Sequence, residues 1–293
     1  MDELYGAGVA LVTPFHSDGT IDFAGLEKLI EHQISGGMDY LVSLGTTGEV
    51  ATLSEDERKA VWAFTAEKVK GRVPLVAGIG GNNTAEIIHQ LEQFDASGYA
   101  AVLSVSPYYN KPTQEGIFQH YKALAASSPL PLIIYNVPGR TGSNVSPETT
   151  VRLAKEVDNI VATKEASGSF EQFGKIIRDK PEGFLLISGD DSATLPLMAL
   201  GGVGVISVVA NAFPAEVATL ARMCLDNRFE EARQLHSKLI RITELCFVEG
   251  NPAGVKAILH QLGICGPTVR LPLAGVGTGT LDQIVREVAN LVG

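Results

Sequence analysis

The sequence predicts an α/β fold, a TIM (β/α)8 barrel followed by an all-α C-terminal extension. Eight short apolar runs recur about 20 to 35 residues apart, with helical patterns between them. The runs are continuous stretches of Val, Ile, Leu and Ala without alternation, which is typical of parallel strands covered on both faces. Such a barrel needs about 250 residues, and the chain has 293. We therefore expect a barrel catalytic domain over residues 1–225 and a helical extension over residues 226–293.

The expected elements follow from apolar runs and from helix-capping residues. Ser54 and Glu57 form a capping box that opens one helix, and Gly71 ends that helix before Pro74. Further helices should begin after Asn83, Ser146 and Ser169. In the extension, periodicity predicts helices over residues 214–226, 228–249, 251–262 and 279–291. The expected strands are residues 8–12, 40–44, 75–79, 101–105, 132–136, 160–164, 184–188 and 203–208.

The main alternative is a doubly wound open sheet. Such a fold usually carries a phosphate-binding glycine motif directly after its first strand, and none is present in this sequence. The glycine-rich segments at residues 78–81 and 201–204 have neither P-loop nor dinucleotide-binding spacing. We interpret both segments as turns.

Composition excludes several classes of function. The net charge is −10 and no stretch is rich in Lys or Arg, which argues against nucleic acids and anionic membranes as partners. No apolar run approaches the roughly 20 residues that span a bilayer, and the N-terminus lacks a signal-peptide pattern. The three cysteines are far apart and odd in number, which argues against disulfides and zinc. We therefore expect a cytoplasmic protein.

Lys164 is the most informative residue, because it ends the sixth apolar run. An ammonium group at the end of a buried strand is costly unless it is paired or used. Desolvation disfavours the charged form and lowers the pKa, which leaves a free amine that can attack a ketone. The position of Lys164 therefore predicts a nucleophilic lysine.

Other strands end in residues that suit the same chemistry. Thr46 and Thr47, after the second strand, lie in a glycine-bounded turn that can present N–H groups and hydroxyls to a carboxylate. Tyr135 ends the fifth strand and can transfer a proton, and Arg140 follows it with a fork suited to a second carboxylate. Tyr109 belongs to a proline-bounded tyrosine pair after the fourth strand, which suggests an interface or a site wall.

Rival chemistries have fewer candidate residues. The six histidines show no metal-ligand spacing, so we expect no metal ion. There is no GxSxG motif for a serine hydrolase. Glu49, Glu165, Asp190 and Asp191 could form a carboxylate pair, but a glycosidase cleft would normally contain more aromatic residues than one Trp and seven Tyr.

Together these segments resemble the dihydrodipicolinate synthase / N-acetylneuraminate lyase superfamily of Schiff-base barrel enzymes, over essentially the whole chain. The resemblance rests on residues 45–49, 107–112 and 135–142 and on Lys164. It is closest to the synthase branch, because sialate lyases carry apolar or small residues where this chain has Arg140. Residues 251–256 also resemble the NPxxxK segment of that branch.

The resemblance implies a mechanism without a dissociable cofactor. Lys164 would form an imine with pyruvate, whose carboxylate would bind to Thr46 and Thr47 while Tyr135 moves protons. The enamine would then attack L-aspartate 4-semialdehyde, whose carboxylate would bind to Arg140. Cyclisation would give 4-hydroxy-tetrahydrodipicolinate, an intermediate of lysine and diaminopimelate biosynthesis, and release the lysine.

The resemblance also implies a homo-oligomer, a tetramer built as a dimer of dimers. Tyr109 would reach into a neighbouring subunit and complete a Tyr–Thr–Tyr proton relay with Tyr135 and Thr47. Gly189 and Ile206 would line the pyruvate pocket through their backbone carbonyl groups.

Two other functions remain open at this point. One is another pyruvate aldolase of the superfamily, which would cleave N-acetylneuraminate or a 2-keto-3-deoxy sugar acid. The other is a barrel without catalytic activity that binds a keto acid as a sensor or scaffold.

Feedback inhibition by lysine is expected to be weak or absent. In regulated members of the superfamily, free lysine binds at a subunit interface beside the 45–49 turn, and this chain matches only part of that site. Arg58 would place a positive charge there and pair with Glu86. The matching positions are Asn82, Glu86 and Tyr108, and the departing positions are Val50, Glu55 and Arg58.

Overall fold

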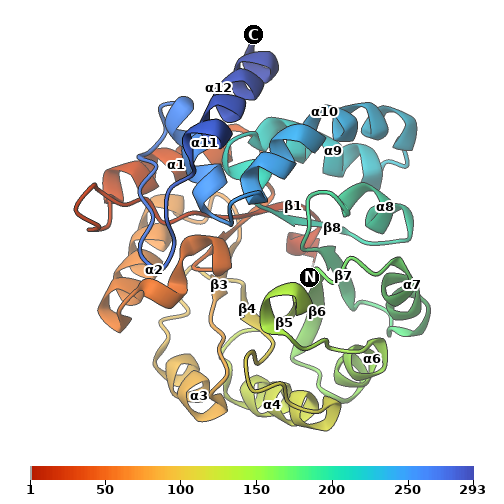
Figure 1. Cartoon of the computed structure of the whole chain (residues 1–293). Helices are drawn as coiled ribbons and strands as arrows, with labels where there is room; N and C mark the ends of the chain where they lie inside the picture. Colours follow the sequence, from red (N-terminus) through yellow and green to blue (C-terminus); the bar gives the residue numbers. More distant parts are fainter. Residues whose placement is uncertain (1) are drawn as a thin grey trace.

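The structure, a computed structural model, describes residues 2–293 and contains a closed barrel of eight parallel strands (Figure 1). Each strand pairs with the next along the chain, and β8 returns to pair with β1. This closure confirms the expected fold class. The strands are β1 (Gly6–Ala10), β2 (Tyr40–Ser43), β3 (Leu75–Gly78), β4 (Ala101–Val105), β5 (Leu132–Asn136), β6 (Ile160–Glu165), β7 (Leu185–Ser188) and β8 (Gly204–Ser207).

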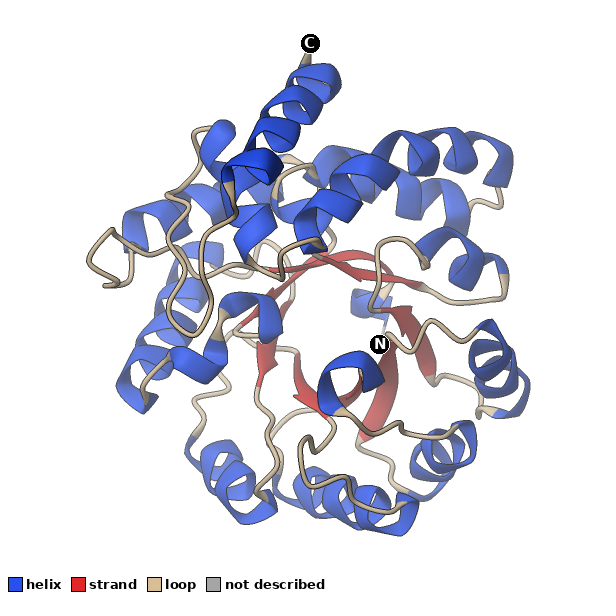
Figure 2. Cartoon of the chain, in the orientation of Figure 1, coloured by secondary structure: helices blue, strands red, loops and turns tan. Residues whose placement is uncertain are grey.

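Helices surround the barrel and shield its outer face (Figure 2). Those that follow β1 to β8 are α1 (Phe23–Ser35), α2 (Glu55–Val69), α3 (Thr84–Gln93), α4 (Gln114–Ser127), α5 (Pro138–Thr141), α6 (Pro147–Glu156), α7 (Phe170–Asp179), α8 (Thr194–Ala199) and α9 (Pro214–Leu225). Short 3-10 turns are η1 (Asp2–Leu4), η2 (Thr46–Gly48), η3 (Val50–Thr52) and η4 (Val209–Asn211). None of the helices in residues 2–293 is long and apolar enough to cross a membrane.

Several expected boundaries are wrong by one or two residues, and β1 and α2 show the physical reasons. Strand β1 begins and ends two residues before the expected range 8–12, because its ladder with β8 starts at Gly6, and the Val12 N–H donates to the Asn211 side chain. Helix α2 ends before Gly71, because Lys70 itself takes the left-handed capping conformation, with φ 53°, and donates to Ala66. The expected capping box of Ser54 and Glu57 is confirmed.

The barrel interior is filled by side chains, so a cavity can open only at one end. Tyr40 and Ile206 belong to this inner apolar cluster. A larger apolar cluster lies between the strands and the surrounding helices. Backbones also approach closely where the barrel closes: a Cβ on Gly204 would lie 2.0 Å from the Gly6 carbonyl oxygen. The barrel interior itself therefore has no room for a ligand, and a site of this fold is expected among the loops beyond the strands.

The last helices form a separate layer on one side of the barrel, drawn in blue in Figure 1. They are α10 (Phe229–Phe247), α11 (Ala253–Gln261) and α12 (Thr278–Val292), and they pack against one another and against α8, α9 and η4. All four expected C-terminal helices, α9 among them, are present within two residues of their expected ends. The largest differences are that α11 begins two residues late, after Pro252, and that α10 ends two residues early. We propose residue 225, where α9 ends, as the boundary of the catalytic barrel.

Candidate active site

A cavity of about 580 Å³ lies at the carboxyl ends of the strands. Six of the expected site residues line it, namely Thr46, Thr47, Tyr135, Arg140, Lys164 and Gly189. The other two, Tyr109 and Ile206, do not. The extension also contributes to its wall, through Ile240, Thr243, Glu244, Phe247 and Asn251. Residues from distant parts of the sequence thus meet at one end of the barrel.

Lys164 lies in β6 with only 5% of its surface exposed. Burial lowers the pKa of its amine to about 7, the Asp191 carboxylate acts in the opposite direction, and the Arg140 charge lowers it further. Its Nζ atom lies 4.3 Å from the centre of the Tyr135 ring. A large fraction of this amine is therefore neutral, and nucleophilic, at neutral pH.

Gly189 provides the space that the lysine side chain occupies. A Cβ at this position would lie 3.0 Å from both Cγ and Cε of Lys164 and equally close to the Cβ of Ala166. These contacts are tighter than ordinary van der Waals packing. The glycine at the end of β7 is therefore explained by the lysine on the neighbouring strand.

Thr46 and Thr47 form the start of the 3-10 turn η2 after β2. The first N–H groups of such a turn have no partner inside it, so they are free to bind an anion. The rest of the turn is bonded: the Thr13 hydroxyl donates to the Gly48 carbonyl at 2.7 Å, and Asn251 Nδ2 donates to the Thr47 hydroxyl at 2.8 Å. The geometry suits a bound carboxylate.

The expected proton relay requires a correction in its threonine. Burial raises the pKa of Tyr135, while the Arg140 charge and a hydrogen bond with the Thr46 side chain lower it. The hydroxyl beside the phenol thus belongs to Thr46, because the Thr47 hydroxyl is directed towards Asn251. Sequence order alone could not distinguish the two adjacent hydroxyls.

Arg140 lies in the one-turn helix α5 and has an exposed side chain. No carboxylate within residues 2–293 forms an ion pair with its guanidinium group. The α5 turn places this charge at the cavity wall, where it is available to a second anion.

Tyr109 and Ile206 lie away from the cavity for different reasons. Tyr109 has 85% of its surface exposed and a left-handed backbone, with φ 75°, and its N–H donates to Thr141. Its ring therefore extends from a loop that is anchored to α5. Ile206 is 1% exposed and belongs to the barrel interior.

Asp191 does not line the cavity but acts on Lys164 through its charge, and the sequence identified it only as one of several strand-end carboxylates. It accepts hydrogen bonds from the Ser207 hydroxyl and from the Val208 and Val209 N–H groups. Its charge raises the pKa of Lys164. No motif marks this role, since it depends on how β7 and β8 are arranged around the lysine.

A second hollow of about 390 Å³ lies between α2 and α3, outside the barrel, and includes Glu55 and Arg58. Glu55 pairs with Lys59, while Glu86 accepts from Gln90 at 3.4 Å. Within residues 2–293 no ion pair joins Arg58 to Glu86, so that expected pairing is wrong.

The opposing effects of two charges on Lys164 can be measured. We expect reductive methylation of its amine to follow a pH midpoint near 7, against about 10.4 for exposed lysines. Asp191→Asn should lower this midpoint, because a stabilising negative charge is lost, and Arg140→Met should raise it. Residue-resolved mass spectrometry over a pH series measures both shifts. A midpoint unchanged in both variants would contradict the electrostatic assignment.

Comparisons with known proteins agree with this geometry. Residues 3–291 match the model of the dihydrodipicolinate synthetase family. The chain is 49% identical to a 4-hydroxy-tetrahydrodipicolinate synthase of Parabacteroides distasonis (97% of this chain, 96% of the relative) and 51% identical to one of Flavobacterium psychrophilum (99% and 100%). The solved structure of a dihydrodipicolinate synthase from Aquifex aeolicus superposes with a TM-score of 0.94 at 41% identity, covering 98% of each chain. The chain belongs to the dihydrodipicolinate synthetase family.

Proposed function

We propose that the chain condenses pyruvate with L-aspartate 4-semialdehyde to 4-hydroxy-tetrahydrodipicolinate, the reaction for which its relatives are named. One observation carries the proposal: a buried amine with a pKa of about 7 shares a cavity with the N–H groups that begin η2 and with Arg140, which forms no ion pair within residues 2–293. The amine and the turn suit the keto group and the carboxylate of a 2-keto acid, and the arginine suits the carboxylate of a second substrate.

The first substrate is assigned to the side of the cavity formed by Lys164 and η2. The pyruvate carboxylate accepts from the Thr46 and Thr47 N–H groups, and the neutral amine attacks the keto carbon. Loss of water from the resulting carbinolamine gives a protonated imine. Tyr135, beside the amine, supplies and removes protons, with Thr46 as its hydroxyl partner.

The second substrate is assigned to the side formed by Arg140. Loss of a proton from the pyruvate methyl group gives an enamine, which attacks the aldehyde carbon. The amino group of the semialdehyde then displaces Lys164 from the imine carbon and closes the ring. A cavity of about 580 Å³ has room for both small molecules.

Two alternatives are less well supported. A sialate or sugar-acid lyase would need to bind a long polyhydroxylated chain, for which the exposed Arg140 is not a suitable partner. A keto-acid sensor without catalytic activity would not require the buried neutral amine of Lys164, whose desolvation is costly.

We further propose a cytoplasmic homo-oligomer, a tetramer assembled as a dimer of dimers. Tyr109 supports the assembly, because its ring is 85% exposed on a loop that is anchored to Thr141. In the relay it would come from the neighbouring subunit and meet Thr46. All three cysteines are buried and free, which agrees with a reducing compartment.

The reaction is tested by offering pyruvate with aspartate semialdehyde and, separately, sialate. We expect turnover only with the first pair, and borohydride in the presence of pyruvate should label Lys164 alone. Lys164→Met should abolish both the turnover and the borohydride label, because methionine keeps the packing but lacks the amine. Turnover of sialate, or a label on another lysine, would contradict the proposal.

Arg140→Ala separates the two carboxylate sites. The loss of a charge-assisted contact, about 1.5–3 kcal/mol, should raise the KM for the semialdehyde by tenfold or more. The pyruvate concentration that half-saturates borohydride trapping should stay close to wild type. A collapse of pyruvate binding with normal use of the aldehyde would mean that the two sites are reversed.

The interface role of Tyr109 is tested by Tyr109→Phe together with dilution. The hydroxyl is the only group lost, so we expect lower kcat and an unchanged oligomer in light scattering. Dissociated subunits should lose activity as well. A fully active monomer would exclude a contribution across subunits.

Lysine inhibition should be weak, because Glu55 and Arg58 place charged side chains where the regulated site is expected. Millimolar lysine should leave the initial rate nearly unchanged. Inhibition at lysine concentrations well below about 1 mM, a typical dissociation constant for a weakly bound small ligand, would contradict this expectation.

A further inference from the structure

The turn that carries Thr46 and Thr47 has an unfavourable backbone at both ends. Leu44 has φ 58° and Glu49 has φ 54°, and neither is a glycine. L-residues rarely adopt this left-handed conformation, and they keep it only where the surrounding contacts impose it. The shape of the turn must therefore be held by its neighbours.

Glu49 makes the strongest of these contacts through a fully buried carboxylate. One oxygen accepts from Lys256 Nζ, and the other accepts from the Arg270 N–H at 2.9 Å. Lys256 is also fully buried, donates to the Thr268 carbonyl at 2.8 Å and lies 4.1 Å from the centre of the Phe15 ring. A buried ion pair is tolerated when both partners have such additional contacts.

A second contact reaches the same turn from the same segment. Asn251 donates to the Thr47 hydroxyl, and Lys256 follows five residues later in α11. The segment 251–256 thus holds the turn on both sides of Gly48. Because this segment belongs to the C-terminal extension, the turn is fixed by residues outside the barrel strands.

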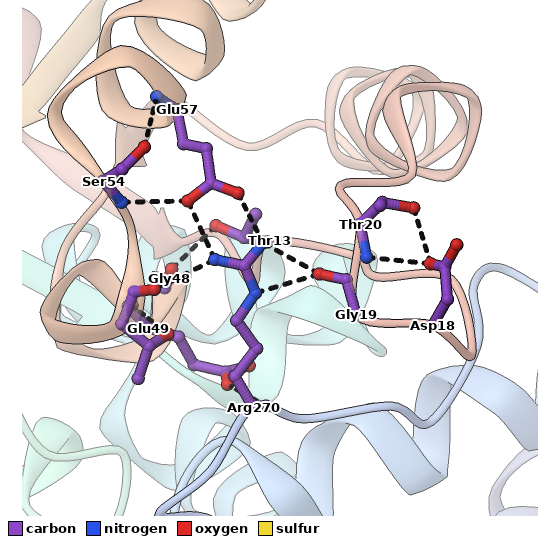
Figure 3. Close-up of polar contacts among 10 residues, drawn as sticks. Thr13, Asp18, Gly19, Thr20, Gly48, Glu49, Ser54, Glu57 and Arg270 are labelled. Atoms are coloured by element: carbon purple, nitrogen blue, oxygen red, sulfur yellow. Dashed lines mark hydrogen bonds and ion pairs between the residues drawn. The ribbon is translucent and has the colours of Figure 1, made fainter.

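Arg270 links Glu49 to a second carboxylate, that of Glu57, and the three residues form one polar cluster. Figure 3 shows its guanidinium group between the Glu57 carboxylate and the Gly19 carbonyl. Only the backbone N–H of Arg270 contacts Glu49. The Glu57 pair therefore belongs to the same polar cluster but does not touch the anion-binding turn, which makes it a natural control.

We propose that Glu49 and Lys256 are a positioning pair that holds the Thr46–Thr47 turn in its carboxylate-binding shape. Neither residue lines the cavity, so neither contacts the substrate. The inference rests on the proposed function, because it names what sets the pyruvate affinity of that same site. It also makes pyruvate binding depend on the C-terminal extension.

Three variants separate positioning from simple stabilisation. Glu49→Gln and Lys256→Met each remove one charge and leave the other buried without its partner. The double variant removes both charges at nearly constant volume, and such replacements are often neutral for stability. The readouts are the melting temperature, kcat and the pyruvate concentration that half-saturates borohydride trapping on Lys164.

We expect both single variants to melt at a lower temperature and to need about tenfold more pyruvate or more, since small misplacements of binding groups are costly. The double variant should recover most of the melting temperature but keep the weak pyruvate binding, because the contact between Lys256 and the turn is still lost. Its KM for the semialdehyde should stay within about twofold of wild type, because Arg140 is untouched. The inference would be overturned if the folded double variant reached half-saturation of borohydride trapping at the same pyruvate concentration as the wild type.

Glu57→Gln is the matched control. It weakens the Arg270 pair, so we expect a lower melting temperature with unchanged pyruvate dependence. An equal loss of pyruvate binding in this control would indicate general loosening and would also overturn the inference. Should the double variant fail to fold, Glu49→Asp carries the same test, because it keeps both charges but withdraws the carboxylate from Lys256. Absence of a pyruvate adduct in the wild type would refute the proposed function itself.

Discussion

The desolvation of one amine is the constraint on which the rest of the site depends. Moving the pKa of Lys164 from 10.5 to about 7 corresponds to a differential free energy on the order of 5 kcal/mol. Between these two pH values the unfolded chain binds the proton and the folded chain does not. This group therefore makes folding more favourable as pH rises from 7 to 10.5 and opposes it fully below pH 7. The other interactions of the folded barrel offset this free-energy cost, and the charge of Asp191 reduces it.

The groups around the Lys164 amine each contribute a different feature of the site. Gly189 leaves space for the lysine side chain, and Arg140 provides an exposed charge at the cavity wall. The threonine turn presents N–H groups whose geometry depends on two unfavourable backbone conformations. Contacts from α11 and from the loop at Arg270 hold that turn. In the proposed reaction the barrel thus supplies the reactive group, and the extension helps to shape the anion site.

The sequence was sufficient for the fold, because parallel strands buried on both faces leave continuous apolar runs. It was least accurate at β1, where Gly and Ala give a weak apolar signal and hydrogen bonding with β8 sets the start. Six of the eight expected site residues meet in one cavity because they lie at or just after the carboxyl ends of parallel strands, which share one end of the barrel. The direction of a side chain could not be predicted from the sequence. The sequence therefore did not show which of the two hydroxyls, that of Thr46 or that of Thr47, lies beside Tyr135. Nor could it assign Asp191 or Asn251, whose contacts arise only on folding, and the role proposed for Tyr109 involves a second subunit.

The central claim is that a buried neutral amine and a strained turn together capture a 2-keto acid. A crystal structure after soaking with pyruvate tests this claim most directly. The account requires continuous density from Lys164 Nζ to the former keto carbon, with the carboxylate at the Thr46 and Thr47 N–H groups. Pyruvate bound without a covalent link, or with its carboxylate at Arg140, would contradict it.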